Sequence, residues 1–116
     1  MAIGPFAVIA GPTIGAGEYL SSILNVSTGN AGIVRITMPD AWTGNAWLMF
    51  QISQDGTYFS DLVWPNGSPV VVTVVPGATV VTQTDTWQAA YFKFRSGRAA
   101  TPIPQLEERK FICVTR

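Results

Sequence analysis

Histidine is absent from this sequence, and cysteine occurs only once, at Cys113. Histidine is the side chain that most often serves as a general base and as a metal ligand, so its absence argues against histidine-based catalytic sites and most zinc sites. A single cysteine cannot form a disulfide within the chain. Cys113 lies between Ile112 and Val114, and this apolar setting predicts a small buried side chain rather than a reactive thiol.

Charge is scarce and balanced. Lys and Arg together number seven, Asp and Glu also number seven, and charged residues make up 12% of the chain. A neutral chain lacks the basic surface that binds nucleic acid or anionic membranes, so neither partner is expected. Apolar residues nevertheless reach 47%, although no apolar run approaches the ~20 residues of a membrane span. This balance predicts that another protein subunit covers part of the surface.

Catalytic chemistry would have to come from carboxylates and hydroxyls. The carboxylates form no evident acid–base pair, because Asp55 lies in an expected turn, Asp85 in a loop and residues 107–108 in a charged corner. Serine and cysteine nucleophiles lack a histidine base, and the glycine-rich start lacks the Gly-Lys-Ser/Thr of a phosphate-binding loop. We predict that the protein is not an enzyme and holds no metal or cofactor. A calcium site built from Asp55 and Asp61 stays open as an alternative, without the spacing of a helix–loop–helix calcium site.

Residues 1–18 contain one charged residue, Glu18, and no basic residue precedes Arg35. A secretory signal peptide needs a positive start and a longer apolar stretch, so none is expected. Glycines and prolines argue against a helix here, and we predict an extended N-terminal arm over 1–18 and a folded domain over 19–116. The arm is either a frayed end, an extra edge strand or a segment that packs on a neighbouring subunit. Its apolar residues are the candidate partner contacts: Ile3, Phe6, Val8, Ile9 and Ile14.

The clearest structural signal is a β-hairpin over residues 46–62. Apolar side chains alternate along its first half, which is the period-two pattern of a strand with one buried face. Asp55-Gly56 follows, and this pair favours a type I′ turn, in which both central residues have positive φ. Tyr58, Phe59 and Leu62 continue the return strand.

Other segments with strand patterns are separated by glycine and proline turns, without helical periodicity. They cover residues 19–27, 32–38, 70–75, 79–84, 87–95 and 110–115. Segments 70–75 and 79–84 are predicted to form a second hairpin around Pro76-Gly77. Seven or eight short strands at this spacing are typical of an all-β fold, and we favour an antiparallel two-sheet β-sandwich over a small barrel.

Alternation also assigns side chains to faces. It predicts that Ile33 and Ile36 lie on opposite faces of one strand, and that Phe92 and Phe94 share a face of another. Phe50 is expected to meet Phe92 in one buried core.

Four tryptophans give the sequence one feature that could bind a ligand. Each lies near the start or end of an expected strand, where an indole often closes the open end of a sandwich, and we expect this packing role for most of them. Exposed indoles also stack on sugars. Trp42, Trp64 and Trp87 are therefore candidate glycan contacts under an alternative function.

Several short segments carry a family resemblance. They are Met38-Pro39-x-x-Trp42-Thr43, Phe50-Gln51-x-Ser53-x-Asp55-Gly56-Thr57-x-Phe59-x-Asp61-Leu62, Lys93-Phe94-Arg95-Ser96-Gly97, Pro102-x-Pro104-Gln105 and Arg109. Over about residues 32–116 the chain resembles a family of small virion-associated proteins of tailed bacteriophages and prophages, most specifically in the Phe-Gln-x-Ser-x-Asp-Gly and Arg-Ser-Gly segments. Residues 63–86 match the family poorly. The Ser-x-Asp-Gly-x-x-Phe segment also resembles a hairpin of discoidin-like jelly-roll modules, which implies a jelly-roll-like sandwich.

The resemblance implies a structural virion protein, made in the bacterial cytoplasm and released in virions. We favour a capsid decoration, or cement, protein that stabilises the head lattice. Its expected partners are the major capsid protein and further copies of itself, with a trimer favoured. The alternative is a tail or baseplate module that binds a host-surface glycan through the candidate tryptophans.

Overall fold

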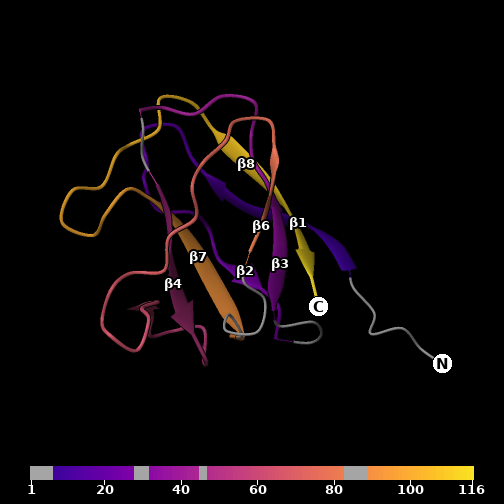
Figure 1. The fold of residues 1–116 in the computed structure, drawn as a ribbon, viewed down its shortest axis with the longest axis vertical. Coiled ribbons are helices and arrows are strands. Elements are labelled where there is room, and N and C mark those ends of the chain that lie inside the picture. The colour runs from indigo at the N-terminus through magenta and orange to yellow at the C-terminus, as the bar shows by residue number, and fades with distance from the viewer. Residues whose placement is uncertain (1–6, 28–31, 45–46, 83–88) are drawn as a thin grey trace.

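The computed structural model describes residues 7–27, 32–44, 47–82 and 89–116, and within them it contains strands and no helix. The strands are β1 (Ala7–Ile14), β2 (Leu24–Asn25), β3 (Ile33–Thr37), β4 (Leu48–Ser53), β5 (Ser60–Asp61), β6 (Thr79–Val81), β7 (Tyr91–Ser96) and β8 (Arg109–Thr115). They form two sheets of four, ordered β1-β8-β3-β6 and β2-β7-β4-β5, with antiparallel pairing throughout (Figure 1). The prediction of an all-β, antiparallel two-sheet sandwich is confirmed.

The core lies between the sheets and is filled by alternate side chains of the central strands. Phe50, Phe94 and Phe111 make successive edge-to-face contacts, with ring centroids 5.2 Å and 5.1 Å apart. Phe92 and Phe50 are buried in this same core, and Phe92 and Phe94 share its face, as predicted. Cys113 is fully buried there, and burial raises the pKa of its thiol to about 12. It therefore acts as the small apolar side chain that the sequence predicted.

Strands β4 and β5 form the expected hairpin, but the predicted type I′ turn is wrong. Residues 54–59 connect the strands, and within the described ranges only glycines have positive φ, Gly56 among them at 81°. Asp55 therefore cannot occupy the first central position of that turn. Its carboxylate instead accepts hydrogen bonds from the loop backbone, with Oδ1 2.8 Å from the amide of Thr57 and 3.0 Å from that of Tyr58.

The predicted second hairpin, 70–75 with 79–84, is also wrong. Strand β6 pairs with β3 in one sheet, whereas Val72 exchanges two backbone hydrogen bonds with Leu48 in the other. The chain thus changes sheets at the turn formed by Pro76-Gly77. Two β-branched segments separated by a turn usually pair with each other, and the pattern alone does not distinguish a hairpin from a crossing between sheets.

The first expected strand, 19–27, is regular only at β2. Before β2, the chain still follows β7 through Ser21, whose amide donates to the carbonyl oxygen of Phe94 at 2.8 Å. The hydroxyl oxygen of Ser21 accepts the hydrogen bond from the Phe94 amide, also at 2.8 Å. A side-chain hydroxyl thus satisfies a ladder donor, so the backbone departs from regular strand geometry.

Strand β3 contains an irregularity that the sequence pattern did not predict. Its register against β8 shifts between Ile33 and Arg35, as at a β-bulge. The shift interrupts the alternation of side chains, so Ile33 and Ile36 are both fully buried. The prediction that these two residues face opposite sides is wrong.

Residues 7–14 of the predicted arm form β1, an edge strand that pairs with β8 of the same chain. The C-terminal half of β1 is also held from its other side. The amide of Ser22 donates to the carbonyl oxygen of Thr13 at 2.9 Å, and the Thr13 amide donates to the Ser22 hydroxyl at 3.1 Å. Of the three interpretations of the arm, the extra edge strand is the one that describes residues 7–14.

Candidate interaction surface

The outward side of the β1-β8-β3-β6 sheet carries two rows of side chains, in which β1, β8 and β6 contribute apolar residues and β3 contributes Arg35 and Thr37. One row is Val8, Val114, Arg35 and Val81, and the next is Ala10, Ile112, Thr37 and Thr79. We call these eight residues the outer sheet face. The row between them, Ile9, Cys113, Ile36 and Val80, is directed into the core.

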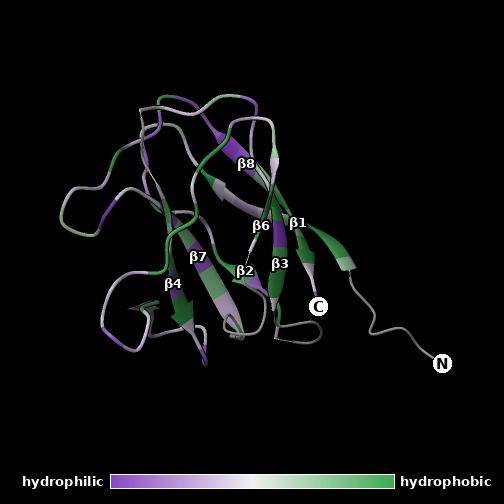
Figure 2. Cartoon of the chain, viewed as in Figure 1, coloured by the Kyte–Doolittle hydropathy of each residue, from purple (hydrophilic) through white to green (hydrophobic). Residues whose placement is uncertain are grey.

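Exposure and charge set the outer sheet face apart from ordinary protein surface. Val8, Ile112 and Val81 are 65%, 50% and 68% exposed. Arg35 is the single charged residue of the eight. Figure 2 shows that β3 is mainly hydrophobic, but its hydrophobic residues Ile33 and Ile36 face the core rather than the outer sheet face. Scattered exposed hydrophobic residues are common, but a set shared by three strands on one side of a sheet is typical of a surface that contacts another protein.

The outward side of the β2-β7-β4-β5 sheet differs, because its charged groups have partners. The pairs are Arg95 Nη1 with Asp61 Oδ1 at 2.8 Å, Lys93 Nζ over the Phe59 ring at 4.5 Å, and the Arg98 guanidinium over the Trp47 ring at 4.9 Å. Cation–π contacts and a partly buried ion pair satisfy the charges within the chain itself. This side therefore needs no partner to cover its charges.

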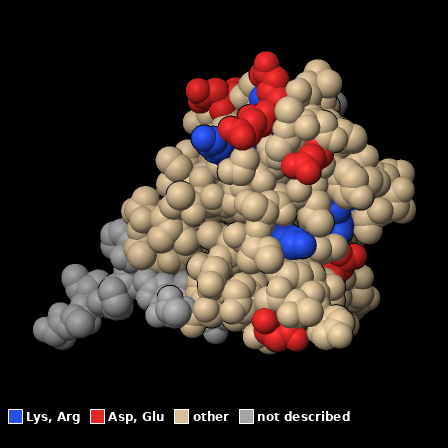
Figure 3. Space-filling view, turned by 180° about the vertical axis from the view of Figure 1, so that it is seen from behind, with Lys and Arg blue, Asp and Glu red and all other residues tan. Residues whose placement is uncertain are grey.

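Acidic and thiol side chains are spread over several strands and loops in the part of the chain that the structure describes. No cluster of three or more His, Cys, Asp or Glu residues there could hold a metal ion. Hydrogen bonds from the amides of Tyr58 and Thr57 and from the Ser53 hydroxyl hold the pKa of the Asp55 carboxyl below its ordinary value. Figure 3 shows the acidic side chains in view gathered mainly at one end of the molecule, with few charges across its middle. That the protein is not an enzyme stays a prediction.

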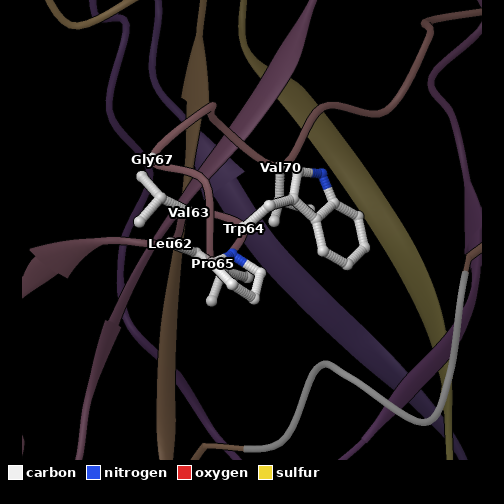
Figure 4. Close-up of a pocket in the computed structure, with 6 residues that line it drawn as sticks. All are labelled: Leu62, Val63, Trp64, Pro65, Gly67 and Val70. Carbon is white, nitrogen blue, oxygen red and sulfur yellow. The ribbon is translucent and has the colours of Figure 1, made fainter.

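The structure does not bring the candidate glycan contacts together. Trp42 is half-buried against the core, with its ring 5.9 Å from that of Phe111. Trp64 also packs on the core, and Trp87 lies outside the described residues. An open hollow of about 570 Å³ is lined by Leu62, Val63, Trp64, Pro65, Gly67 and Val70. In Figure 4 the indole of Trp64 extends away from Val63 and Pro65, so its ring does not form a platform beside them.

Two aromatic residues that the sequence analysis passed over are better exposed. Tyr58 is 81% exposed in the loop after β4, and Trp47 is 42% exposed just before β4. Their exposure follows from loop geometry and strand facing, which sequence alone did not determine at these positions.

The candidate partner contacts of the arm fall into three groups. Ile3 and Phe6 lie outside the described residues. Ile14 is fully buried in the core of its own chain, and Ile9 packs against that core. Val8 is the candidate whose side chain is exposed, and it belongs to the outer sheet face.

Several residues of the family resemblance have hydrogen-bonding roles inside the fold. Gln105 is fully buried, and its amide nitrogen donates to the Ser96 hydroxyl at 2.9 Å. Its Oε1 accepts from the Thr43 amide at 2.8 Å and from Arg109 Nε at 3.0 Å. Gly97 has a φ of 88°, and a Cβ there would lie 2.9 Å from a backbone oxygen. These segments thus hold strands and loops of the fold together, and they lie largely outside the outer sheet face.

Comparison of the chain with protein-family models, with curated proteins and with solved structures gave no match. Among the described residues, no helix is long and apolar enough to cross a bilayer.

Proposed function

We propose that this protein is a structural component of a tailed-bacteriophage virion, a decoration protein that binds the major capsid protein and stabilises the head lattice. The resemblance of residues 32–116 to small virion-associated proteins of tailed bacteriophages supports the assignment to a virion. The observation that carries the proposed role is the outer sheet face, on which β1, β8 and β6 expose Val8, Ile112 and Val81. A protein that acts by permanent contact needs such a surface and needs no catalytic groups.

Burial of the outer sheet face would supply part of the binding free energy. Full burial of a valine or isoleucine side chain contributes roughly 1.5–3 kcal/mol, and Val8, Ile112 and Val81 each still expose half or more of their surface. Contact through uncharged β-branched side chains is also insensitive to salt. Binding to the capsid is therefore expected to persist at high ionic strength.

The glycan-binding alternative has less support from the geometry. Trp42 and Trp64 are half-buried and pack on the core, so only part of each ring is exposed for stacking on a sugar.

The experiment is rebinding of purified protein to particles that lack it, measured by co-sedimentation at low and high salt. Ile112→Lys and Val81→Lys each place a charge on the outer sheet face, at side chains that are already exposed. Each is expected to weaken binding at least roughly tenfold, because the introduced charge must be desolvated at the interface.

Tyr58→Lys is the matched control, because it introduces the same charge at an exposed site on the other sheet's loop. It is expected to bind like the parent. Parent-like binding by both outer-face variants would contradict the assigned surface, and failure of the parent itself to bind particles would contradict the proposed function.

A further inference from the structure

Strand β1 has an open edge over part of its length. It pairs with β8 on one side, and no strand of the described residues pairs with its other side. The contacts between Thr13 and Ser22 close that second side only near the end of the strand. Residues 7–11 therefore present backbone amides and carbonyls that another strand could pair with. In Figure 1 this end of β1 lies at the outside of the molecule.

The other sheet edges in the described chain are very short, whereas β1 is long and is protected only near its end, by Pro12 and by the contacts of Thr13 with Ser22. Strands β2 and β5 have two residues each and β6 has three, whereas β1 has eight. Short length and charged side chains are the usual means by which proteins prevent pairing at an edge. Asp61 supplies such a charge on β5, but β1 contains no charged residue.

We propose that the open edge of β1 pairs with β1 of a second copy of this chain, antiparallel about a two-fold axis near Ile9. A second copy fits because the edge is uncharged, so two identical strands approach without repulsion. Antiparallel pairing about an axis is also the arrangement in which one surface patch is complementary to itself. In this register Val8 of each copy lies opposite Ala10 of the other, and both side chains belong to the outer sheet face.

The pairing joins two sheets of four strands into one continuous sheet. The outer sheet faces of the two copies then lie side by side and form one apolar surface of twice the width. The inference makes the predicted contact of the arm with a neighbouring subunit specific, and it proposes a two-fold dimer in place of the trimer favoured from the sequence. It stands whether or not the outer sheet face binds a capsid.

The test is analytical ultracentrifugation of the full chain over a range of micromolar concentrations. The parent is expected to reach twice its monomer mass of 12.5 kDa. Val8→Lys places a charge on the open edge at a 65% exposed side chain and is expected to weaken the dimer at least roughly tenfold. Point variants are used because deletion of the arm would also remove Ile14 from the core.

Val81→Lys is the control, because Val81 is 68% exposed on the same face but lies on β6, at the opposite edge of the sheet. Its dimer is expected to be as stable as that of the parent. Amide hydrogen exchange supplies a second readout: protection of residues 7–11 should rise with protein concentration. A monomeric or trimeric parent, equal weakening by both lysine variants, or exchange at residues 7–11 that does not depend on concentration would each overturn the proposal.

Discussion

At the scale of single residues, Asp55 organises the loop between β4 and β5. One carboxylate oxygen accepts hydrogen bonds from two backbone amides and from the Ser53 hydroxyl. These donors stabilise the ionised form, so the pKa of the carboxyl is lowered in the folded protein. The residue that suggested a tight turn therefore closes a longer loop.

This arrangement predicts a pH dependence of stability. A carboxyl whose pKa is lower in the folded state stabilises the fold above its unfolded pKa, near 3.8, and loses that contribution as the pH falls through the folded pKa. The melting temperature of the parent should therefore exceed that of Asp55→Asn at neutral pH, and the difference should shrink below about pH 4. Thermal melts followed by circular dichroism measure both. A difference that stays constant with pH would show that the carboxylate charge does not stabilise the loop.

Gly56 and Gly67 give a matched pair of substitutions. Their φ angles are 81° and 88°, so alanine at either position adopts a left-handed conformation that costs roughly 1–2 kcal/mol. A Cβ on Gly56 would lie 3.2 Å from the Tyr91 ring, whereas a Cβ on Gly67 would meet nothing within 4 Å. Gly56→Ala should therefore lower the free energy of unfolding more than Gly67→Ala in denaturant titrations. Equal losses would mean that the loop moves away from Tyr91 at little cost.

At the scale of elements, the buried faces of β4 and β7 determine stability. Phe50 and Phe92 are buried in the single core between the sheets, and truncation of either to alanine should cost about 3–5 kcal/mol in chemical unfolding. Tyr58→Ala, at an 81% exposed site, is the control and should change stability by no more than about 0.5 kcal/mol. A loss below about 1 kcal/mol for either phenylalanine would contradict the assigned facing.

The strands were predictable where one face is buried and the backbone is regular. Alternation around Phe50, Phe92 and Phe94 identified the core, because burial acts on every second side chain of a strand. Alternation failed at β3, where the shift between Ile33 and Arg35 brings an extra residue into the strand. Such shifts depend on the neighbouring strand, so a single segment does not reveal them.

The sequence also did not show which strands pair with each other. The crossing at Pro76-Gly77 looks in the sequence like a hairpin turn, and the pairings of Val72 with Leu48 and of β6 with β3 separate the two arrangements. The outer sheet face was hidden for the same reason, since its two rows combine residues from four distant segments. Apolar composition predicted that a partner surface exists, and the strand register located a candidate.

At the scale of the whole molecule, the two sheets have outward sides of different character. One side satisfies its charges internally through an ion pair and cation–π contacts, and the other exposes Val8, Ile112 and Val81. The second side also carries two charged residues on its central strands, Arg35 on β3 and Lys110 on β8. This asymmetry is expected of a protein that is covered on one side and solvated on the other. It also connects the two proposals, because pairing along β1 would widen the apolar side without changing the polar one.

The most direct test of the proposed function is cryo-electron microscopy of tailed-phage virions assembled in the presence of this chain. The account predicts density for the two-sheet domain on the head, with the β1-β8-β3-β6 sheet against the major capsid protein and with Ile112 and Val81 buried in the contact. Density for the domain at the tail, or on the head with the β2-β7-β4-β5 sheet against the capsid, would contradict it.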